Sequence, residues 1–445
     1  MLSYHDAIQI IEENKLFEFL KLKEFILNNR TAMSLSDLSL LIELSNNNRE
    51  KHSAYYTNDF IIEEIMELLP SFQDKDTISI IEPSVGAGNF LPFLFEKYKG
   101  KEQVNIKVID IDKNIIDLLK LIYNENIPKN FNIEFICADF IHKEFAPVDL
   151  VVGNPPFSKL KMIQKKDFIT NYSDKVKNLS AFFLEKSIKI SNYVSLVMPK
   201  NILNTPEYFE VRSMVRKKNI CSIIDFGEEG FKGVLVETVN LVISNDNLYN
   251  DEVVIISKPK NITKKQKKDY IFDDNLPYWV IYRDHHFDNI LKKLELGVFD
   301  VFRDRQITNS NSSFKKSTDS DIRVIKARNI DDTGENIVDI ANYDSFINKD
   351  VLEKCAVSKY LNSDSVYLTP NMTYNPRVMK KKKGYVVNGS VAILIPKYNF
   401  ELDTTQMLFF SSNEFRKFYK TARNYQTRSL NIDSSSCYWF GIYKG

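Results

Sequence analysis

Between residues 77 and 245, short runs of β-branched and other apolar residues alternate with segments whose apolar residues recur every three or four positions. We expect strands at TISIIEP, VNIKVIDID, IEFICAD and DLVVG, and further strands at YVSLVMP, ICSIIDFG and TVNLVIS. Helices are predicted at NFLPFLFEKYK and KNIIDLLKLIYNE. Strands that alternate with helices need crossover connections, so the pattern predicts an α/β fold with a mainly parallel sheet.

The same pattern divides the chain into four parts. Residues 1–50 show helical spacing and predict an N-terminal extension too short for a core of its own. The α/β pattern predicts a domain over 51–256, and the lysine-rich stretch over 257–275 predicts an exposed basic linker. Beyond it, shorter apolar runs are separated by NSNSS, DDTGEN and NG turns. These runs predict a second domain of mixed α+β type over 276–445.

Composition agrees with more than one soluble domain. The chain has 445 residues, of which 43% are hydrophobic and 27% charged, with a net charge of +1. The charge is unevenly spread, because residues 371–445 hold twelve basic and four acidic residues, an excess of eight positive charges. This basic excess is interleaved with aromatic and amide residues, as in FRKFYKTARNYQTRSLN, which is typical of a surface that contacts a polyanion. A solvated helix face beside a loop would leave the same pattern.

Several classes are excluded by what the sequence lacks. No apolar run reaches about 18 residues, and the N-terminal segment carries acidic residues where a secretory signal needs a basic and then an apolar stretch. The four cysteines have no CxxC spacing, which argues against a disulfide framework and a zinc site. The sequence therefore predicts a cytoplasmic protein with no membrane segment and no metal; the cysteines are Cys137, Cys221, Cys355 and Cys437.

A glycine loop follows the first predicted strand, in IIEPSVGAGNFLPFL. Gly86 and Gly88 allow the backbone to turn tightly and to approach a ligand closely. Asp110 ends the next strand, where a carboxylate can accept hydrogen bonds from both hydroxyls of a ribose. A dinucleotide fingerprint would need glycine where Leu91 stands, and Glu82 would repel a pyrophosphate. The loop therefore predicts a nucleoside ligand that carries a cation.

S-Adenosylmethionine has these features, with a sulfonium, an α-amino group and a ribose. We expect Glu82 near its amino group, the glycine backbone around its methionine part and Asp110 on its ribose. The following strand ends in Cys-Ala-Asp-Phe, where Asp139 can accept from the adenine amine and Phe140 can cover the ring. A strand-end turn is the commoner role for an aspartate in the position of Asp139.

The segment DLVVGNPPF places Asn154, Pro155, Pro156 and Phe157 directly after a buried strand. Two prolines remove two backbone donors, so the loop presents acceptors to an amine substrate. The Asn154 side-chain oxygen and the Pro155 carbonyl can hold both hydrogens of an exocyclic amine and direct its lone pair at the sulfonium methyl. Phe157 offers a face on which the base can stack. Asn-Pro alone is a common turn pair, and the full tetrapeptide after a strand is what indicates a methyltransferase.

In the order of these motifs, the chain resembles the gamma-class, Taq-type DNA adenine-N6 methyltransferases of bacterial restriction-modification systems. HSAYYTNDFIIEEIMELL resembles the N-terminal cofactor helix of that family, and EPSVGAGNF, VIDID, ADF and GNPPF resemble its cofactor and catalytic motifs. The resemblance implies a Rossmann-like methyltransferase core, catalytic over 51–256, with a C-terminal target-recognition domain over 276–445. It implies S-adenosyl-L-methionine as cofactor, with Thr57 near the methionine carboxylate. The implied cofactor-binding residues are Tyr56, Thr57, Glu82, Pro83, Ser84, Gly86, Gly88, Asp110, Ile111, Asp139 and Phe140.

The resemblance also implies double-stranded DNA as substrate, with the target adenine flipped out of the helix. The catalytic loop ends in Phe157, where many relatives have tyrosine. The family places a second aromatic ring on the other face of the base, for which Phe231 is the candidate, although a buried anchor would look the same. For contacts with DNA we single out basic residues near the C-terminus: Lys380, Lys381, Lys382, Lys383, Arg423 and Arg428.

The expected function is therefore site-specific adenine-N6 methylation of DNA as the modification enzyme of a restriction-modification system, with a separately encoded endonuclease as an implied partner. Three alternatives remain open. RNA adenine or cytosine N4 requires similar chemistry, and protein-glutamine methyltransferases also carry an Asn-Pro-Pro loop. A non-catalytic DNA-binding protein could retain a methyltransferase core.

Overall fold

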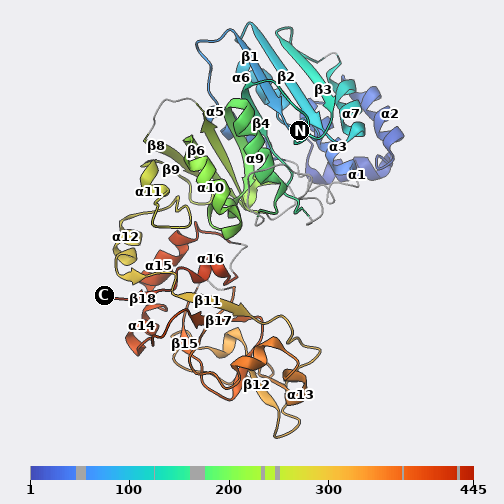
Figure 1. Ribbon diagram of the computed structural model, residues 1–445. Helices are drawn as coiled ribbons and strands as arrows, with labels where there is room; N and C mark the ends of the chain where they lie inside the picture. The colour runs from blue at the N-terminus through green and yellow to red at the C-terminus, as the bar shows by residue number, and fades with distance from the viewer. Residues whose placement is uncertain are drawn as a thin grey trace. The chain divides into compact units, whose positions relative to one another are not determined.

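The computed structural model describes residues 2–46, 57–124, 126–160, 176–231, 236–245, 251–372, 375–427 and 431–444. The chain forms two compact units (Figure 1). Unit 1 spans Met1–Tyr278 and unit 2 spans Trp279–Gly445. This division lies close to the boundary predicted at residue 276. None of the described helices is long and apolar enough to cross a membrane.

Unit 1 is built on a nine-stranded sheet in the order β3-β2-β1-β4-β5-β7-β6-β8-β9. Its first five strands in this order are parallel, as the sequence predicts, whereas β7 is antiparallel to both of its neighbours. The strands are β1 (Thr77–Glu82), β2 (Gln103–Asp110), β3 (Phe131–Cys137), β4 (Val148–Gly153), β5 (Ser191–Pro199), β6 (Asn219–Gly227), β7 (Thr238–Ser244), β8 (Glu252–Ser257) and β9 (Ile262–Lys267).

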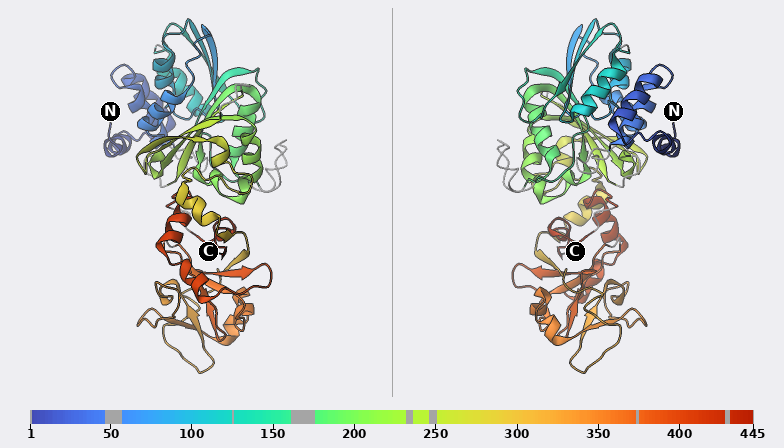
Figure 2. Two further views of the ribbon diagram at one scale, coloured as in Figure 1. Left: turned by 90° about the vertical axis from the view of Figure 1, so that its left-hand side faces the viewer. Right: turned by 90° about the vertical axis from the view of Figure 1, so that its right-hand side faces the viewer.

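Helices connect the strands and pack on the sheet. The predicted helices after β1 and β2 are present, and the N-terminal extension is helical as expected. Its apolar residues join the core of the sheet, because its second and third helices pack beside the helix after β2 (Figures 1 and 2). The longer helices are α1 (Tyr4–Glu13), α2 (Phe19–Asn29), α3 (Leu35–Ser45), α5 (Asp59–Leu68), α6 (Leu91–Tyr98), α7 (Lys113–Tyr123), α9 (Leu179–Ile190) and α10 (Phe209–Arg216).

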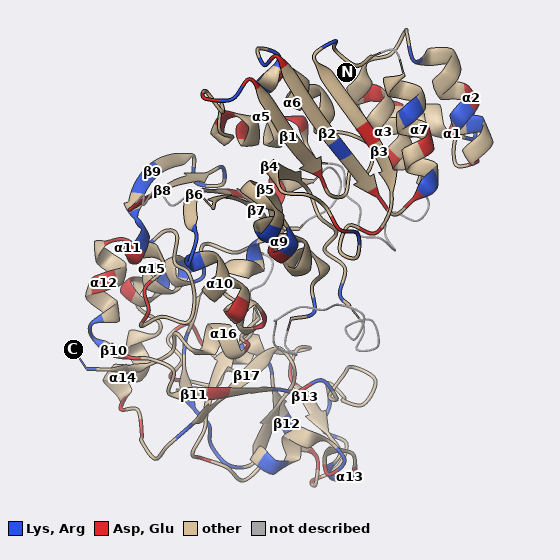
Figure 3. Ribbon diagram, turned by 45° about the horizontal axis from the view of Figure 1, so that its top comes forward, with Lys and Arg blue, Asp and Glu red and all other residues tan. Residues whose placement is uncertain are grey.

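The prediction of an exposed linker over 257–275 is wrong. This stretch continues the sheet, because β8 pairs with β9 in antiparallel register and the short helix α11 (Lys268–Ile271) follows. Alternate residues of β9 are exposed, and its lysines are visible as blue segments in Figure 3. Lysines are common on edge strands, since their charge blocks pairing with another chain. A strand of this kind has no apolar run and resembles a linker in sequence.

Unit 2 is of mixed α+β type, as predicted. A four-stranded antiparallel sheet in the order β11-β17-β14-β15 and a three-stranded sheet in the order β13-β12-β16 share one apolar core. The strands of these sheets are β11 (Phe299–Arg303), β12 (Ile322–Ile325), β13 (Ser345–Ile347), β14 (Tyr367–Pro370), β15 (Met379–Lys380), β16 (Tyr385–Val387) and β17 (Val391–Pro396). The remaining elements are α12 (His285–Leu291), β10 (Leu294–Glu295), α13 (Lys349–Leu352), α14 (Thr404–Phe409), α15 (Asn413–Ala422), α16 (Ser434–Cys437) and β18 (Ile442–Tyr443).

Candidate active site

The carboxyl ends of β3, β2, β1 and β4 meet at one edge of the sheet. Glu82 is the last residue of β1, Gly153 is the last residue of β4, and Asp110 lies opposite Cys137 at the ends of β2 and β3. Open α/β sheets bind their ligands at this edge. The fold therefore brings together the glycine loop, the candidate ribose acid and the Asn-Pro-Pro-Phe loop, which are far apart in sequence.

The glycine loop is joined to Asp110 by hydrogen bonds. The Gly86 amide donates to Asp110 Oδ2 at 3.0 Å, and the Asp112 amide donates to Oδ1 at 2.9 Å. Each carboxylate oxygen can accept a further hydrogen bond, so the acid remains able to bind a ribose hydroxyl. Gly88 has φ +82°, and a Cβ atom there would lie 2.9 Å from Leu119 Cδ2. Glycine is therefore required for the helix α7 side chains to pack against this loop.

Glu82 is a buried carboxylate with an open acceptor. It is 1% exposed, and its Oε2 has no hydrogen-bond partner among the described residues. Burial, and then the charge of Asp110, raise the pKa of Glu82 well above its ordinary value. A buried carboxylate is stabilised best by a cation that also donates hydrogen bonds. The site therefore fits the α-amino group of S-adenosylmethionine.

We expect cofactor binding to release a proton from Glu82. With its raised pKa, the free protein retains the proton on Glu82 over a range in which an ordinary carboxyl group has lost it, and an ammonium ligand must displace that proton. Affinity should fall as the pH is lowered through the raised pKa. Calorimetry in two buffers of different ionisation enthalpy should show release of up to about one proton per bound cofactor.

The control for this prediction is Glu82→Gln, which should bind the cofactor more weakly and release no proton from this site. Because a raised carboxyl pKa lowers stability above the ordinary value of 4.5, the variant without cofactor should melt at least as high as the wild type at neutral pH. Equal proton release by both proteins would contradict the role of Glu82.

Beside Asp110, the side chain of Ile111 is 63% exposed at the sheet edge. An exposed apolar side chain there suits the face of an adenine ring. Asp139 follows β3 and accepts from the Ile141 amide at 2.8 Å, and its Oδ2 lies 2.8 Å from His142 Nδ1. Asp139 thus shapes the local turn, and its contact with adenine stays a prediction.

Phe140 lies in an aromatic cluster. Its ring stacks with Phe145 at a centroid distance of 5.6 Å and with Phe183 of α9 at 5.2 Å. Lys186 Nζ lies 5.3 Å from the centroid of the Phe140 ring and donates to the Ile141 carbonyl at 2.7 Å. Phe140 is 2% exposed, so this cluster fixes the loop that carries Asp139. Direct cover of an adenine by the Phe140 ring stays a prediction.

The Asn-Pro-Pro-Phe loop, the candidate catalytic loop, lies against the loop that follows β1. Gly153 has φ +155°, and a Cβ atom there would lie 3.3 Å from Pro83 Cδ. Ser84 Oγ donates to the main-chain carbonyl of Asn154 at 2.9 Å. Pro155, the next residue, is buried. Pro83 and Ser84 therefore lie against the Asn-Pro-Pro-Phe loop, and their expected contact with the cofactor stays a prediction.

The side chain of Asn154 donates from Nδ2 to Thr57 Oγ1 at 3.2 Å. Thr57 is buried, and its backbone forms an isolated antiparallel bridge with Phe231. The structure thus places Thr57 next to the candidate catalytic loop, and its contact with the cofactor stays a prediction. Tyr56 lies outside the described residues.

Phe157 and Phe231 come together, although 74 positions separate them. Their ring centroids are 5.7 Å apart and the rings are tilted by 58°. A base stacked between two rings needs about 7 Å between the ring planes, twice the spacing of stacked bases. The two rings are therefore neighbours, as expected for two sides of one base-binding site. Because they are too close together to hold a base between them, a base could enter only if the rings moved apart. Phe231 is 4% exposed.

A buried ionic cluster lies at the same edge and was missed from the sequence. Lys200 directly follows β5, and its Nζ lies 2.8 Å from Asp225 Oδ2 of β6 and 3.5 Å from Glu237 Oε1. The side chains are 2%, 0% and 6% exposed. The sequence does contain a signal for this cluster, because each of three largely apolar strands has one charged residue at or beside its end. Lys200 follows β5, Asp225 lies within β6 and Glu237 precedes β7. The cluster connects the ends of β5, β6 and β7.

In unit 2 the prediction that Lys381 contacts DNA is wrong. Lys381 is 1% exposed, and its Nζ donates to the carbonyls of Leu361, Ser363 and Lys382 at 2.9–3.3 Å. Burial lowers the pKa of Lys381 to about 8. Lys381 is therefore a structural residue and cannot contact a phosphate in this conformation. The other three ammonium groups remain candidates: Lys380, which pairs with Glu401, Lys382, and Lys383, which pairs with Asp364.

The prediction that Arg423 contacts DNA is also wrong. It is 5% exposed, and its guanidinium donates to the Tyr419 hydroxyl at 3.2 Å and to the Asn431 carbonyl at 3.4 Å. These contacts hold the end of α15 in unit 2 and leave the guanidinium inaccessible to DNA. Arg428 lies outside the described residues.

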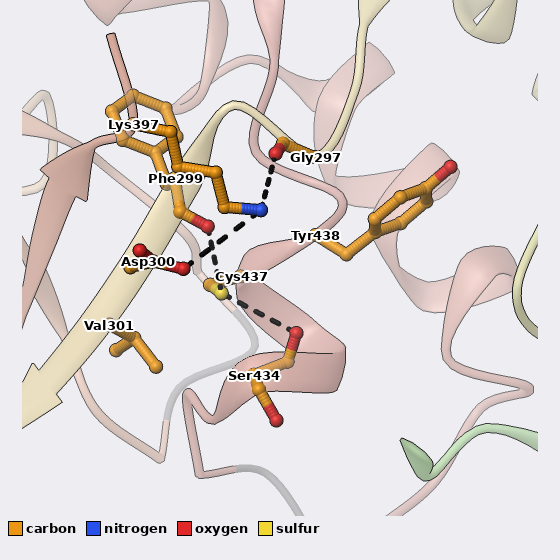
Figure 4. Close-up of a pocket in the computed structure, with 8 residues that line it drawn as sticks. All are labelled: Gly297, Phe299, Asp300, Val301, Lys397, Ser434, Cys437 and Tyr438. Atoms are coloured by element: carbon orange, nitrogen blue, oxygen red, sulfur yellow. Dashed lines mark hydrogen bonds and ion pairs between the residues drawn. The ribbon is translucent and has the colours of Figure 1, made fainter.

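A pocket of about 280 Å³ lies in unit 2, and none of the predicted catalytic or cofactor-binding residues lines it (Figure 4). On its wall, Lys397 Nζ donates to the Gly297 carbonyl at 2.8 Å and lies 3.9 Å from Asp300 Oδ1. Over the described ranges, no three His, Cys, Asp or Glu side chains are grouped as a metal site requires. The pocket is lined by Gly297, Phe299, Asp300, Val301, Lys397, Ser434, Cys437 and Tyr438.

Comparison with known proteins supports the interpretation of unit 1. Residues 21–231 match the Eco57I restriction-modification methylase family. The chain is 26% identical over 245 residues to the Type II methyltransferase M.VspI of Vibrio sp. (strain 343), covering 52% of this chain and 57% of that protein. It is 23% identical over 257 residues to the modification methylase CviBIII of Paramecium bursaria Chlorella virus NC1A, covering 57% of this chain and 60% of that one. The chain thus spans under two thirds of the length of each relative.

Among solved structures, the fold is similar to that of the Type IIL restriction-modification enzyme MmeI, determined in complex with DNA. The TM-score is 0.61 with 12% identity, over 92% of this chain and 71% of that one. The sheet order and this similarity show the Rossmann-like α/β fold that the sequence predicts. Residues 21–231 are therefore similar to methyltransferases of restriction-modification systems.

Proposed function

We propose that this protein transfers a methyl group from S-adenosylmethionine to the N6 amine of a flipped-out adenine in double-stranded DNA. The observation that carries the proposal is the position of Asn154. It follows β4 at the carboxyl edge of the sheet, and its loop is bonded to the loop after β1 through Ser84. An amine held at Asn154 would thus lie beside the region in which Glu82 and Asp110 fit the cofactor.

Asn154 and Pro155 act on the substrate amine through acceptors. The exocyclic nitrogen of adenine is a poor nucleophile because its lone pair is delocalised into the ring. The Asn154 side-chain oxygen and the Pro155 carbonyl would each accept one of its hydrogens, which favours a pyramidal nitrogen and stabilises the positive charge that develops there. The cofactor supplies the methyl group as an electrophile. No strongly basic side chain is needed in this arrangement.

The aromatic pair would receive the base. Phe157 follows the two prolines, and Phe231 lies against it. Removing an adenine from the DNA stack costs a few kcal/mol, which stacking on an aromatic face can partly offset. In this proposal the base separates the two rings and lies between them.

Unit 2 would hold the flanking DNA. Basic residues exceed acidic ones by eight in residues 371–445, and Lys382 and Lys383 are exposed there. Contacts between lysines and phosphates orient a protein on DNA without reading its sequence. The cognate restriction endonuclease would be encoded separately, as the family resemblance implies.

The double variant Lys382→Gln/Lys383→Gln should bind DNA more weakly and with a smaller dependence on salt. Each lost phosphate contact lowers the slope of log affinity against log salt concentration by about 0.9, so a decrease of about 2 is expected. Fluorescence anisotropy with a labelled duplex measures this slope. The matched control is Lys21→Gln/Lys23→Gln on α2, which removes the same charge from unit 1. Equal slopes for both variants would contradict the proposed contact.

Single-molecule sequencing of DNA from a methylation-deficient host that expresses the protein tests the function as a whole. One sequence motif that carries N6-methyladenine would establish the reaction, the substrate and the specificity together. N4-methylcytosine would change the base and retain the mechanism. Unmodified DNA from cells that contain soluble protein would refute the proposal and favour RNA, a protein amide or a non-catalytic binding protein.

A further inference from the structure

Thr57 contacts two segments that are distant in sequence. Its Oγ1 accepts the hydrogen bond from Asn154 Nδ2 at 3.2 Å, and its backbone pairs with Phe231 in an antiparallel bridge. Thr57 is buried, with 2% of its surface exposed. One residue therefore lies between the catalytic loop and the segment that carries the second aromatic ring.

Asn58 adds two further bonds to that segment. Its Nδ2 donates to the Glu229 carbonyl at 2.6 Å, and its amide donates to the Gly230 carbonyl at 3.4 Å. Asn58 is also the N-cap of α5, whose Ile61, Ile62 and Ile65 are in the core. Thr57 and Asn58 are thus anchored to the core by helix α5, so Thr57 has a fixed position from which to bind Asn154.

The side-chain amide of Asn154 has a donor end and an acceptor end. A substrate amine that gives its hydrogens to the loop must meet the acceptor end. With the donor end bonded to Thr57, the acceptor end points the other way. If the amide rotated by 180°, it would present N–H groups to the substrate N–H groups, which repel.

We propose that Thr57 is a positioning residue that fixes the orientation of the Asn154 side-chain amide and thereby controls the rate of methyl transfer. The inference rests on the proposed function of Asn154. It differs from the role that the family resemblance implies, in which Thr57 contacts the methionine carboxylate. The two roles predict different measurements, because one changes the transfer rate and the other changes the affinity for the cofactor.

Thr57→Val removes the hydroxyl with little change of shape, and Thr57→Ser retains it. Single-turnover transfer at saturating tritiated S-adenosylmethionine is measured with methylation-free DNA, RNA and protein offered separately. We expect Val to lower the rate about 10- to 100-fold and Ser to restore most of it, with cofactor affinity unchanged in both. A wild-type rate in the Val variant would overturn the inference. So would weaker cofactor binding with an unchanged rate at saturation.

A second measurement does not depend on activity. In protein labelled with ¹⁵N-asparagine, the Asn154 side-chain amide signal is assigned by its loss in Asn154→Ala. Its protons should exchange slowly with solvent in the wild type and in Thr57→Ser, and faster in Thr57→Val. If the wild type methylates none of the three substrates, the proposed function fails, and the exchange rates still decide the orientation. Equal exchange in all three proteins would refute the bond to Thr57.

Discussion

Asn154→Ala is expected to reduce methyl transfer at least about 10³-fold, while the dissociation constant for S-adenosylmethionine changes by less than about twofold. The reason is that, of the two reactants, the Asn154 side chain would contact the substrate amine and not the cofactor, whereas the candidate cofactor groups, Glu82 and Asp110, end other strands. Single-turnover kinetics measure the rate, and calorimetry measures the affinity.

Asp110→Ala is the counterpart and should give the opposite result. Loss of hydrogen bonds to the ribose weakens cofactor binding, so the KM for the cofactor rises while transfer at saturation falls less than in the Asn154 variant. If Asn154→Ala retains a rate near that of the wild type, the proposed mechanism is wrong. If instead it loses cofactor affinity as strongly as Asp110→Ala, Asn154 belongs to the cofactor site.

Lys200→Met should destabilise unit 1 by about 3–5 kcal/mol, because it leaves two buried carboxylates without their cation. Lys200 contacts Asp225 and Glu237 at the ends of three strands, where water cannot reach the charges. Urea unfolding followed by circular dichroism measures the effect. Both tryptophans, Trp279 and Trp439, belong to unit 2, so tryptophan fluorescence follows unit 2 and should shift less than the circular dichroism signal.

Two further variants test why Lys200→Met is expected to lose stability. Lys99→Met breaks an exposed ion pair with Glu96 on α6 and should change stability by less than about 1 kcal/mol. The triple variant Lys200→Met/Asp225→Asn/Glu237→Gln removes the uncompensated charges and should recover part of the stability. A loss of similar size in the Lys99 and Lys200 variants would show that burial of the charges is unimportant.

The alternation of apolar runs was enough to predict the first seven strands, β1 to β7, and their class. The signal is clearest at strands such as β4 and β7, which are buried along their whole length and read as nearly continuous apolar runs. The same signal fails at β9. Its residues are an isoleucine, a threonine, three lysines and a glutamine on a sheet edge, alternately half-buried and exposed, and their composition is that of a solvated connection. Amino-acid composition reflects the solvent exposure of a segment, and an edge strand such as β9 is nearly as exposed to solvent as a linker.

The candidate site was predictable wherever the chemistry follows a strand end directly, as at Glu82, Asp110 and Asn154. Contacts between distant segments were not predictable, because nothing in the sequence near Thr57 refers to Asn154 or Phe231. Lys381 shows the same limit within one run of four lysines. All four have the same chemistry, and only the path of the backbone decides which ammonium group turns inward.

The position of β7 between β5 and β6 determines the order in which a nascent chain can complete the sheet. β6 leaves the ribosome before β7 but has no pairing with β5, so it must wait for Thr238–Ser244 to emerge before it can join the strands already formed. The turn that carries Phe231 lies between these two strands. During synthesis, the glycine loop and Asp110 can therefore form first, and the aromatic side of the site is completed last.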